Sequence, residues 1–211
     1  MLHLRHDPAP PVRARPMLAV ALAAAAVAGL AGCQATPDPP TTTSVAPAKA
    51  PTDDVGDGAR QGEAAGQVPD GTTVFDDALP ALANLDPALL AALQQAAADA
   101  EDDGVTFFVN SGWRSAGYQD RLLREAVAQY GSAAEAARWV ASADTSSHVT
   151  GDAVDLQQTG GSQWVADHGA AYGLCLVYAN EPWHVELRPD AADRGCPELY
   201  ADPSQDPRLH G

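Results

Sequence analysis

The chain has 211 residues, enough for one domain of ordinary size with extensions. Its formal net charge is −16, with 28 acidic against 12 basic residues. This acidic balance argues against nucleic acid as a partner, because phosphate binding needs clustered Lys and Arg side chains.

Residues 1–33 have the features of an export signal. Arg5, Arg13 and Arg15 supply positive charge, and an apolar, alanine-rich run follows them. This run is shorter than the roughly 20 residues that span a bilayer comfortably. It ends at Cys33 in the pattern Leu-Ala-Gly-Cys, which resembles a bacterial lipoprotein signal. In such signals the chain is cleaved before the cysteine, which then carries the lipid. We therefore expect an extracytoplasmic, lipid-anchored protein; the alternative is a plain secretory signal with an incidental cysteine.

Residues 34–71 form a predicted linker. The segment is rich in Pro, Thr, Ala, Gly and Asp and contains no aromatic residue. It cannot bury enough apolar surface to offset the entropy lost on ordering. We therefore expect a disordered tether, followed by one folded domain over residues 72–211.

The first half of this domain predicts mainly helices. Apolar residues at helical spacing predict a helix between Asp86, its N-cap, and Gly104. Residues 105–110 are branched or aromatic and predict a buried strand. An apolar face over 116–130 predicts an amphipathic helix, and 132–142 predicts a second, short helix that opens with a capping box.

The second half of the domain predicts three strands and one helix. Residues 153–158 alternate like a strand, and residues 161–173 predict a helix that ends at a glycine. The segments 174–179 and 183–189 predict two strands whose short connection implies an antiparallel hairpin. This order of elements favours an α+β domain over a doubly wound α/β sheet.

Two cysteines remain outside the signal, Cys175 and Cys196. An exported protein meets an oxidising environment, so we expect these two residues to form a disulfide. The closed loop would stabilise the fold by roughly 3 kcal/mol in the chain-entropy model. The alternative, a catalytic thiol, has weak support, because only Arg194 offers a basic neighbour that could lower a thiol pKa.

A histidine and an aspartate flank a polar turn just before the strand at 153–158. Gly151 allows a tight bend in this turn, after His148. Asp155 lies on the small-residue face of the strand, where a carboxylate is costly to bury unless it is paired or bound to metal. A bend that returns His148 over Asp155 would bring two metal ligands together.

A second histidine lies at the start of the last strand. His184 and Glu186 share one face of this strand, and Glu181 can reach that face from the preceding turn. Two neutral imidazoles and one carboxylate make a zinc site with an open fourth position. A zinc-activated water also needs a base that does not bind the metal, for which Glu181 is the best candidate and Glu186 the second.

The segments that carry these residues resemble the motifs of a known family. "SSHVTGDAVDL" (146–156) and "EPWH" (181–184) match the signature motifs of the VanY-type D-alanyl-D-alanine carboxypeptidases, zinc peptidases of the bacterial cell wall. "SGWRSAGYQ" (111–119) matches their upstream substrate motif, with Trp113 in place of the usual tyrosine. The resemblance covers about residues 72–205 and looks closest to actinobacterial members. It implies a small α+β domain with a central antiparallel sheet flanked by helices, of the hedgehog/DD-peptidase type.

The resemblance also implies a role for each matching residue. His148, Asp155 and His184 would bind Zn²⁺, and Glu181 would be the general base. Arg114 would stabilise the oxyanion or hold a substrate carboxylate, since its planar fork suits that task. The residues expected to contact the substrate are Arg114, Gln119, Ser146 and Trp183.

The function implied is removal of the terminal D-alanine from peptidoglycan stem peptides by a monomer that is tethered outside the membrane. The same site would also suit an L,D-carboxypeptidase, a dipeptidase or an endopeptidase on wall peptides. A non-catalytic lipoprotein that binds wall peptides is a further alternative. Loss of a metal ligand or of the base would favour it, but the three ligands and Glu181 are all present. Three roles have structural alternatives: Arg114 as the partner of a surface acid, Ser146 as a turn residue, and Glu186 as either a ligand-orienting or a solvated residue.

Overall fold

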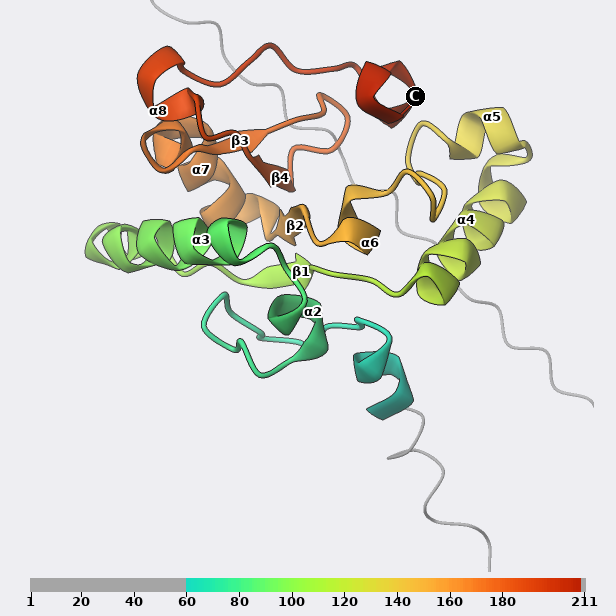
Figure 1. The fold of residues 1–211 in the computed structure, drawn as a ribbon, viewed down its shortest axis with the longest axis horizontal. Coiled ribbons are helices and arrows are strands. Elements are labelled where there is room, and N and C mark those ends of the chain that lie inside the picture. Colours follow the sequence, from blue (N-terminus) through green and yellow to red (C-terminus); the bar gives the residue numbers. More distant parts are fainter. Residues whose placement is uncertain (1–59, 210–211) are drawn as a thin grey trace, which may run out of the picture. The chain divides into compact units, whose positions relative to one another are not determined.

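The computed structural model describes residues 60–209 (Figure 1). The predicted export signal, Cys33 and the first part of the predicted linker lie outside these residues. Within the described range, no helix combines the length and hydropathy that a membrane crossing needs.

A four-stranded sheet lies at the centre of the described domain. Each of its three strand pairs is antiparallel, which confirms the predicted α+β class and the late hairpin. The strands follow the order β1-β2-β4-β3 across the sheet. They are β1 (Val109–Ser111), β2 (Ala153–Leu156), β3 (Leu174–Leu176) and β4 (His184–Leu187).

Helices and helical turns surround this sheet, with α4 and α5 together at one end and α7 and α8 at the other (Figure 1). The longest elements begin and end where the sequence predicts. Asp86 caps α3 by accepting hydrogen bonds from two backbone amides, and Gly104 and Gly131 adopt the left-handed conformation after η1 and α4. The helices are α2 (Pro80–Ala83), α3 (Pro87–Ala100), α4 (Ala116–Tyr130), α5 (Ala133–Ala136), α6 (Ser147–Thr150), α7 (Gln163–His168) and α8 (Ala191–Arg194). The helical turns are η1 (Glu101–Asp103), η2 (Gln158–Ser162), η3 (Gly169–Tyr172), η4 (Pro203–Gln205) and η5 (Pro207–Leu209).

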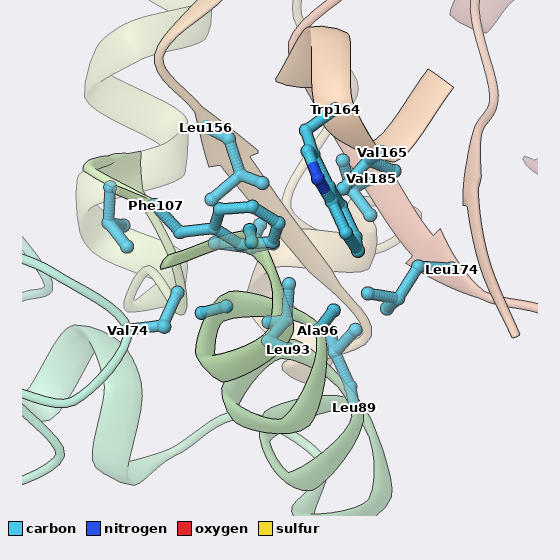
Figure 2. Close-up of a cluster of buried hydrophobic side chains, with 14 of the residues drawn as sticks. Val74, Leu89, Leu93, Ala96, Phe107, Leu156, Trp164, Val165, Leu174 and Val185 are labelled. Atoms are coloured by element: carbon cyan, nitrogen blue, oxygen red, sulfur yellow. The ribbon is translucent and has the colours of Figure 1, made fainter. Parts of the chain in front are cut away.

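The hydrophobic core lies between one face of the sheet and the helices α3 and α7 (Figure 2). Val154 and Leu156 of β2 and Val185 of β4 are fully buried in it. Because successive strand residues point to opposite faces, this arrangement turns Asp155 and His184 to the other face of the sheet. The labelled core residues in Figure 2 are Val74, Leu89, Leu93, Ala96, Phe107, Leu156, Trp164, Val165, Leu174 and Val185.

The first strand is shorter than predicted: β1 spans Val109–Ser111, not 105–110. Phe107 is buried in the core, so the apolar pattern was a correct sign of burial. The residues before Val109 bond instead to the N-terminal segment, through an isolated bridge between Thr73 and Phe108. The N-terminal segment around Thr73 therefore takes the place of regular strand pairing before Val109.

The second short helix also ends early, since α5 stops at Ala136 within the predicted range 132–142. Ser132 caps it by accepting a hydrogen bond from the amide of Glu135, as expected.

The apolar face of α4 is only partly covered. Ala126 is buried, but Tyr130 is 39% exposed, so this helix borders a cavity and does not enclose a core.

The described structure includes residues 60–71, which the sequence places in the predicted linker. Residues 60–64 form a helical turn, and the carbonyl of Ala65 accepts a hydrogen bond from the amide of Ser115. Gly66 has a φ of +99°, and a Cβ there would lie 2.1 Å from the carbonyl oxygen of Trp113. Backbone contacts thus order this segment, which its composition could not reveal.

The predicted disulfide between Cys175 and Cys196 is present. It ties β3 to the chain after α8. Cys175 is also the antiparallel partner of Glu186 on β4.

Candidate metal centre

Three buried side chains from two segments converge on the sheet face opposite the core: His148, Asp155 and His184. Each offers one ligand atom, and these atoms all lie within 4.8 Å of one another. Oδ1 of Asp155 is 3.4 Å from Nε2 of His148 and 3.2 Å from Nδ1 of His184. Two ligands at about 2.0–2.1 Å from a tetrahedral zinc would lie roughly 3.3 Å apart, so the spacing and the donor types fit this ion.

Strand pairing fixes two of the three ligands relative to each other. Asp155 of β2 is the direct partner of His184 on β4, so both side chains leave the sheet on the same face. His148 belongs to α6, a single helical turn where the sequence analysis expected a polar turn. Gly151 ends this turn in the left-handed conformation and leads into β2, which brings His148 over Asp155 as predicted.

The second ring nitrogen of each histidine has a hydrogen-bonding partner. Nδ1 of His148 lies 2.8 Å from the carbonyl oxygen of Gly112. Nε2 of His184 lies 3.3 Å from Oε1 of Glu186. When these nitrogens carry the protons, the opposite nitrogens present lone pairs to a metal, which is the usual arrangement for histidine ligands.

Glu181 lies beside the three ligands and is not a member of the ligand group. Its Oε2 is 3.9 Å from Nδ1 of His184, and its buried Oε1 has no hydrogen-bonding partner among the described residues. Burial raises the pKa of Glu181 to about 7, against the opposing charge of His184. A carboxylate with such a pKa can take up and release a proton near neutral pH.

Arg114 bonds to the metal ligand Asp155 and not to a surface acid. Its Nη2 is 3.0 Å from Oδ2 of Asp155, the oxygen that does not face the histidines. Nη1 donates to Gln119, and Nε donates to Ser111. Gln119 is itself buried and donates to the carbonyl of Ala141.

These residues line one cavity of about 450 Å³. The cavity contains the three ligands, Glu181 and Arg114, together with Gln119, Ser146 and Trp183. The predicted metal ligands, the first candidate for the base and the predicted substrate-binding residues therefore all lie at this cavity, whereas Glu186, the second candidate for the base, does not line it. Its outer wall carries Tyr130 and Trp139, whose rings stack with centroids 5.9 Å apart.

Three contacts around the metal ligands were not predicted. The carbonyl of Gly112 has no side-chain signal in the sequence. Tyr178 packs its ring 5.0 Å from the ring of His184. Arg208, in the C-terminal segment, bonds to Glu186. The only feature of the sequence that could have indicated this ion pair is the basic side chain of Arg208.

The chain belongs to the VanY family: the family model described as D-alanyl-D-alanine carboxypeptidase matches residues 82–190. A D-alanyl-D-alanine carboxypeptidase of Enterococcus faecalis is 33% identical over 110 residues, which are 40% of this chain and 41% of that relative. The chain therefore spans less than half the length of this curated relative.

Solved structures of similar proteins include D,D- and L,D-peptidases. The D,D-pentapeptidase VanY from a VanB-type vancomycin resistance cassette, in a complex with Zn(II), is 30% identical, with a TM-score of 0.45, over 49% of this chain and 72% of that chain. The LdcB LD-carboxypeptidase is 24% identical, with a TM-score of 0.45, over 51% and 61% of the two chains. DacB from Streptococcus pneumoniae is 27% identical, with a TM-score of 0.44, over 53% and 70%.

Proposed function

We propose that this protein is a zinc-dependent D-alanyl-D-alanine carboxypeptidase that removes the terminal D-alanine of peptidoglycan stem peptides. Membership of the VanY family supports the substrate class. The observation that carries the proposal is the placement of Glu181, with a buried and unbonded carboxylate oxygen, beside the set of His148, Asp155 and His184.

The proposed zinc ligands are the two imidazoles and the Asp155 carboxylate. Bound there, zinc would lower the pKa of a water ligand to about 7 and polarise the scissile carbonyl. Glu181 would accept a proton from the attacking water and return it to the leaving amine. Burial favours the protonated form of Glu181, which would help it to hold the proton between the two steps.

Arg114 would bind the oxyanion or the terminal carboxylate of the substrate. Three bonds, to Ser111, Gln119 and Asp155, hold its guanidinium in one orientation. A guanidinium has five N–H donors, so two remain for a substrate oxygen among the described contacts. A fixed donor of this kind costs no reorganisation when charge develops in the transition state.

Gln119, Ser146 and Trp183 would contact the terminal D-alanine. All three line the cavity, and Gln119 and Ser146 are buried there. Gln119 is also held at both ends of its amide, by Arg114 and by the carbonyl of Ala141. It would therefore keep Arg114 in register with the substrate.

We also propose an extracytoplasmic monomer, anchored through a lipid on Cys33 or secreted. The disulfide between Cys175 and Cys196 supports an oxidising compartment. The lipid and its attachment site lie in the part of the chain that the structure does not describe.

Mass spectrometry of products from defined stem peptides tests the proposal. The purified zinc-loaded protein is incubated with a pentapeptide stem that ends in D-Ala-D-Ala and, separately, with the tetrapeptide that results from its trimming. The proposal predicts loss of one alanine from the pentapeptide and no change in the tetrapeptide. Cleavage of the tetrapeptide alone would assign an L,D-carboxypeptidase, and cleavage of neither peptide would contradict the peptidase assignment.

A further inference from the structure

Residues 203–209, the C-terminal segment of the described domain, lie beside the metal centre: Pro203 and Leu209 line its cavity, and Arg208 contacts Glu186. Arg208 in η5 places Nη1 2.7 Å from Oε2 of Glu186 and Nη2 3.4 Å from Oε1. Glu186 is only 3% exposed. Its Oε1 is the atom that lies 3.3 Å from Nε2 of His184, so a continuous chain of contacts joins the tail to a metal ligand.

Arg208 is itself held in place from within the fold. Asp206 is fully buried and accepts hydrogen bonds from the backbone amide and from Nε of Arg208, both at 2.9 Å. Nη2 of Arg208 bonds to the same carboxylate. The hydroxyl of Tyr178 donates to Asp206 at 3.0 Å, while the ring of Tyr178 packs against His184. The segment therefore contacts the ligand by two routes.

A second arginine also binds Glu186, but in a different way. Nη2 of Arg188 lies 2.8 Å from Oε2, the oxygen that does not face His184. Arg208 contacts both oxygens and so fixes the plane of the carboxylate, because a two-point contact from a planar fork sets orientation as well as distance. Without Arg208, Glu186 would keep one contact on each oxygen, Arg188 on Oε2 and His184 on Oε1, but would lose the group that spans both oxygens.

We propose that Arg208, held by Asp206, is a positioning residue that orients the metal ligand His184 through Glu186, and that the C-terminal segment is thereby a working part of the metal centre. The inference rests on the zinc site of the proposed function. A direct partner such as Glu186 sets the tautomer and the ring orientation of a histidine ligand, and loss of that orientation typically weakens metal binding by about 10–100-fold.

Zinc affinity is the direct test, measured by competition with a chromophoric chelator on the purified protein. We expect Arg208→Ala to weaken zinc binding by about 10–100-fold. The matched control is Arg188→Ala, which removes a cation from the same carboxylate but leaves Arg208 on both of its oxygens; it should weaken zinc binding less than Arg208→Ala does. The cobalt-substituted Arg208→Ala protein should also show shifted visible absorption bands, because ligand geometry changes; a loss of fold stability alone would not shift them.

Wild-type zinc affinity and an unchanged cobalt spectrum in Arg208→Ala would overturn the inference, as would an equal loss in Arg188→Ala. Circular dichroism of the metal-free variants checks that each one folds. If Arg208→Ala does not fold, Arg208→Lys decides, since lysine keeps the charge and loses the two-point contact: weakened binding supports the inference and wild-type affinity overturns it. A wild-type protein that binds zinc but cleaves no wall peptide would contradict the proposed function and not this inference.

Discussion

At His184, a proton and a metal ion compete for the same ring nitrogen. Burial by itself lowers the pKa of this imidazole, but hydrogen bonds to Asp155 and Glu186 outweigh burial and raise the pKa to about 9. Burial lowers the pKa of His148, which is therefore neutral at pH 7. The pKa of Asp155 lies well below its ordinary value despite burial, because both histidines and Arg114 stabilise the carboxylate. Metal binding near neutral pH should thus displace the proton of His184.

Zinc affinity should consequently rise with pH. Below about pH 9, His184 holds the proton that the metal must displace. Each rise of one pH unit up to that value lowers the free energy needed to remove this proton. We expect affinity to increase by about tenfold per pH unit between roughly pH 6.5 and 8.5, as measured by chelator competition. An affinity that is flat over this range would show that His184 is already neutral in the metal-free protein.

Loss of the Glu181 carboxylate should separate metal binding from catalysis. We expect Glu181→Ala to retain zinc and to lose at least about 100-fold in kcat, because general acid–base catalysis contributes about 10²–10⁴-fold. Metal analysis and steady-state kinetics on the same samples measure the two effects. Glu101→Ala, on the exposed turn η1, is the matched control and should behave as wild type. Turnover near wild type with zinc bound would refute the role of Glu181.

At the scale of the elements, the turn between α6 and β2 sets the distance between His148 and Asp155. Gly151 has a φ of +83°, and a Cβ there would lie 2.4 Å from the carbonyl oxygen of Asn84. The carbonyl of Gly151 also accepts a hydrogen bond from the amide of Asp86 at 2.8 Å. This glycine therefore joins the metal centre to the start of α3.

Gly151→Ala should lower both the stability and the zinc affinity of the protein. The backbone must shift to relieve the contact with Asn84, and His148 moves with it. Gly131→Ala is the control, since Gly131 also has a positive φ but its Cβ would meet nothing within 4 Å. We expect the control to lose about 1 kcal/mol of stability and no zinc affinity. Equal effects of the two substitutions, measured by thermal unfolding and chelator competition, would remove the special role of this turn.

The disulfide braces the strand that carries His184 and Glu186. Cys175 on β3 faces Glu186 across the strand pair, and its bond to Cys196 closes a loop around Glu181 and His184. We expect reduction, or the double change Cys175→Ala and Cys196→Ala, to lower the free energy of unfolding by about 3 kcal/mol. It should also weaken zinc binding and slow turnover. Unchanged affinity and turnover after confirmed reduction would rule out a role in holding the site.

Local patterns in the sequence determined most elements and most of the site. Asp86 and Gly104 set the limits of the α3–η1 segment, and strand alternation placed Asp155 on the face away from Val154. The sequence could not show that residues before Val109 pair with Thr73 instead of β2. It could not show the bond from Arg208 to Glu186 either, because that contact depends on where the tail lies after the whole domain has folded.

At the scale of the whole described domain, the sheet separates two tasks. One face closes the hydrophobic core with α3 and α7, and the other holds charged residues that would be costly to bury without partners. His148 from α6, Arg114 from the segment before α4 and Arg208 from the tail all meet this second face, close to the β2–β4 pair. Segments far apart in sequence therefore depend on one antiparallel register, in which Asp155 lies opposite His184.

A crystal structure of the zinc-loaded protein, with anomalous scattering measured at the zinc edge, tests this account most directly. We predict one anomalous peak that lies about 2.0–2.2 Å from each of Nε2 of His148, Oδ1 of Asp155 and Nδ1 of His184. Glu181 should lie close to the ion without binding it. A peak elsewhere in the protein, or one bound by fewer than these three side chains, would contradict the assignment of the metal centre and of the hydrolase built on it.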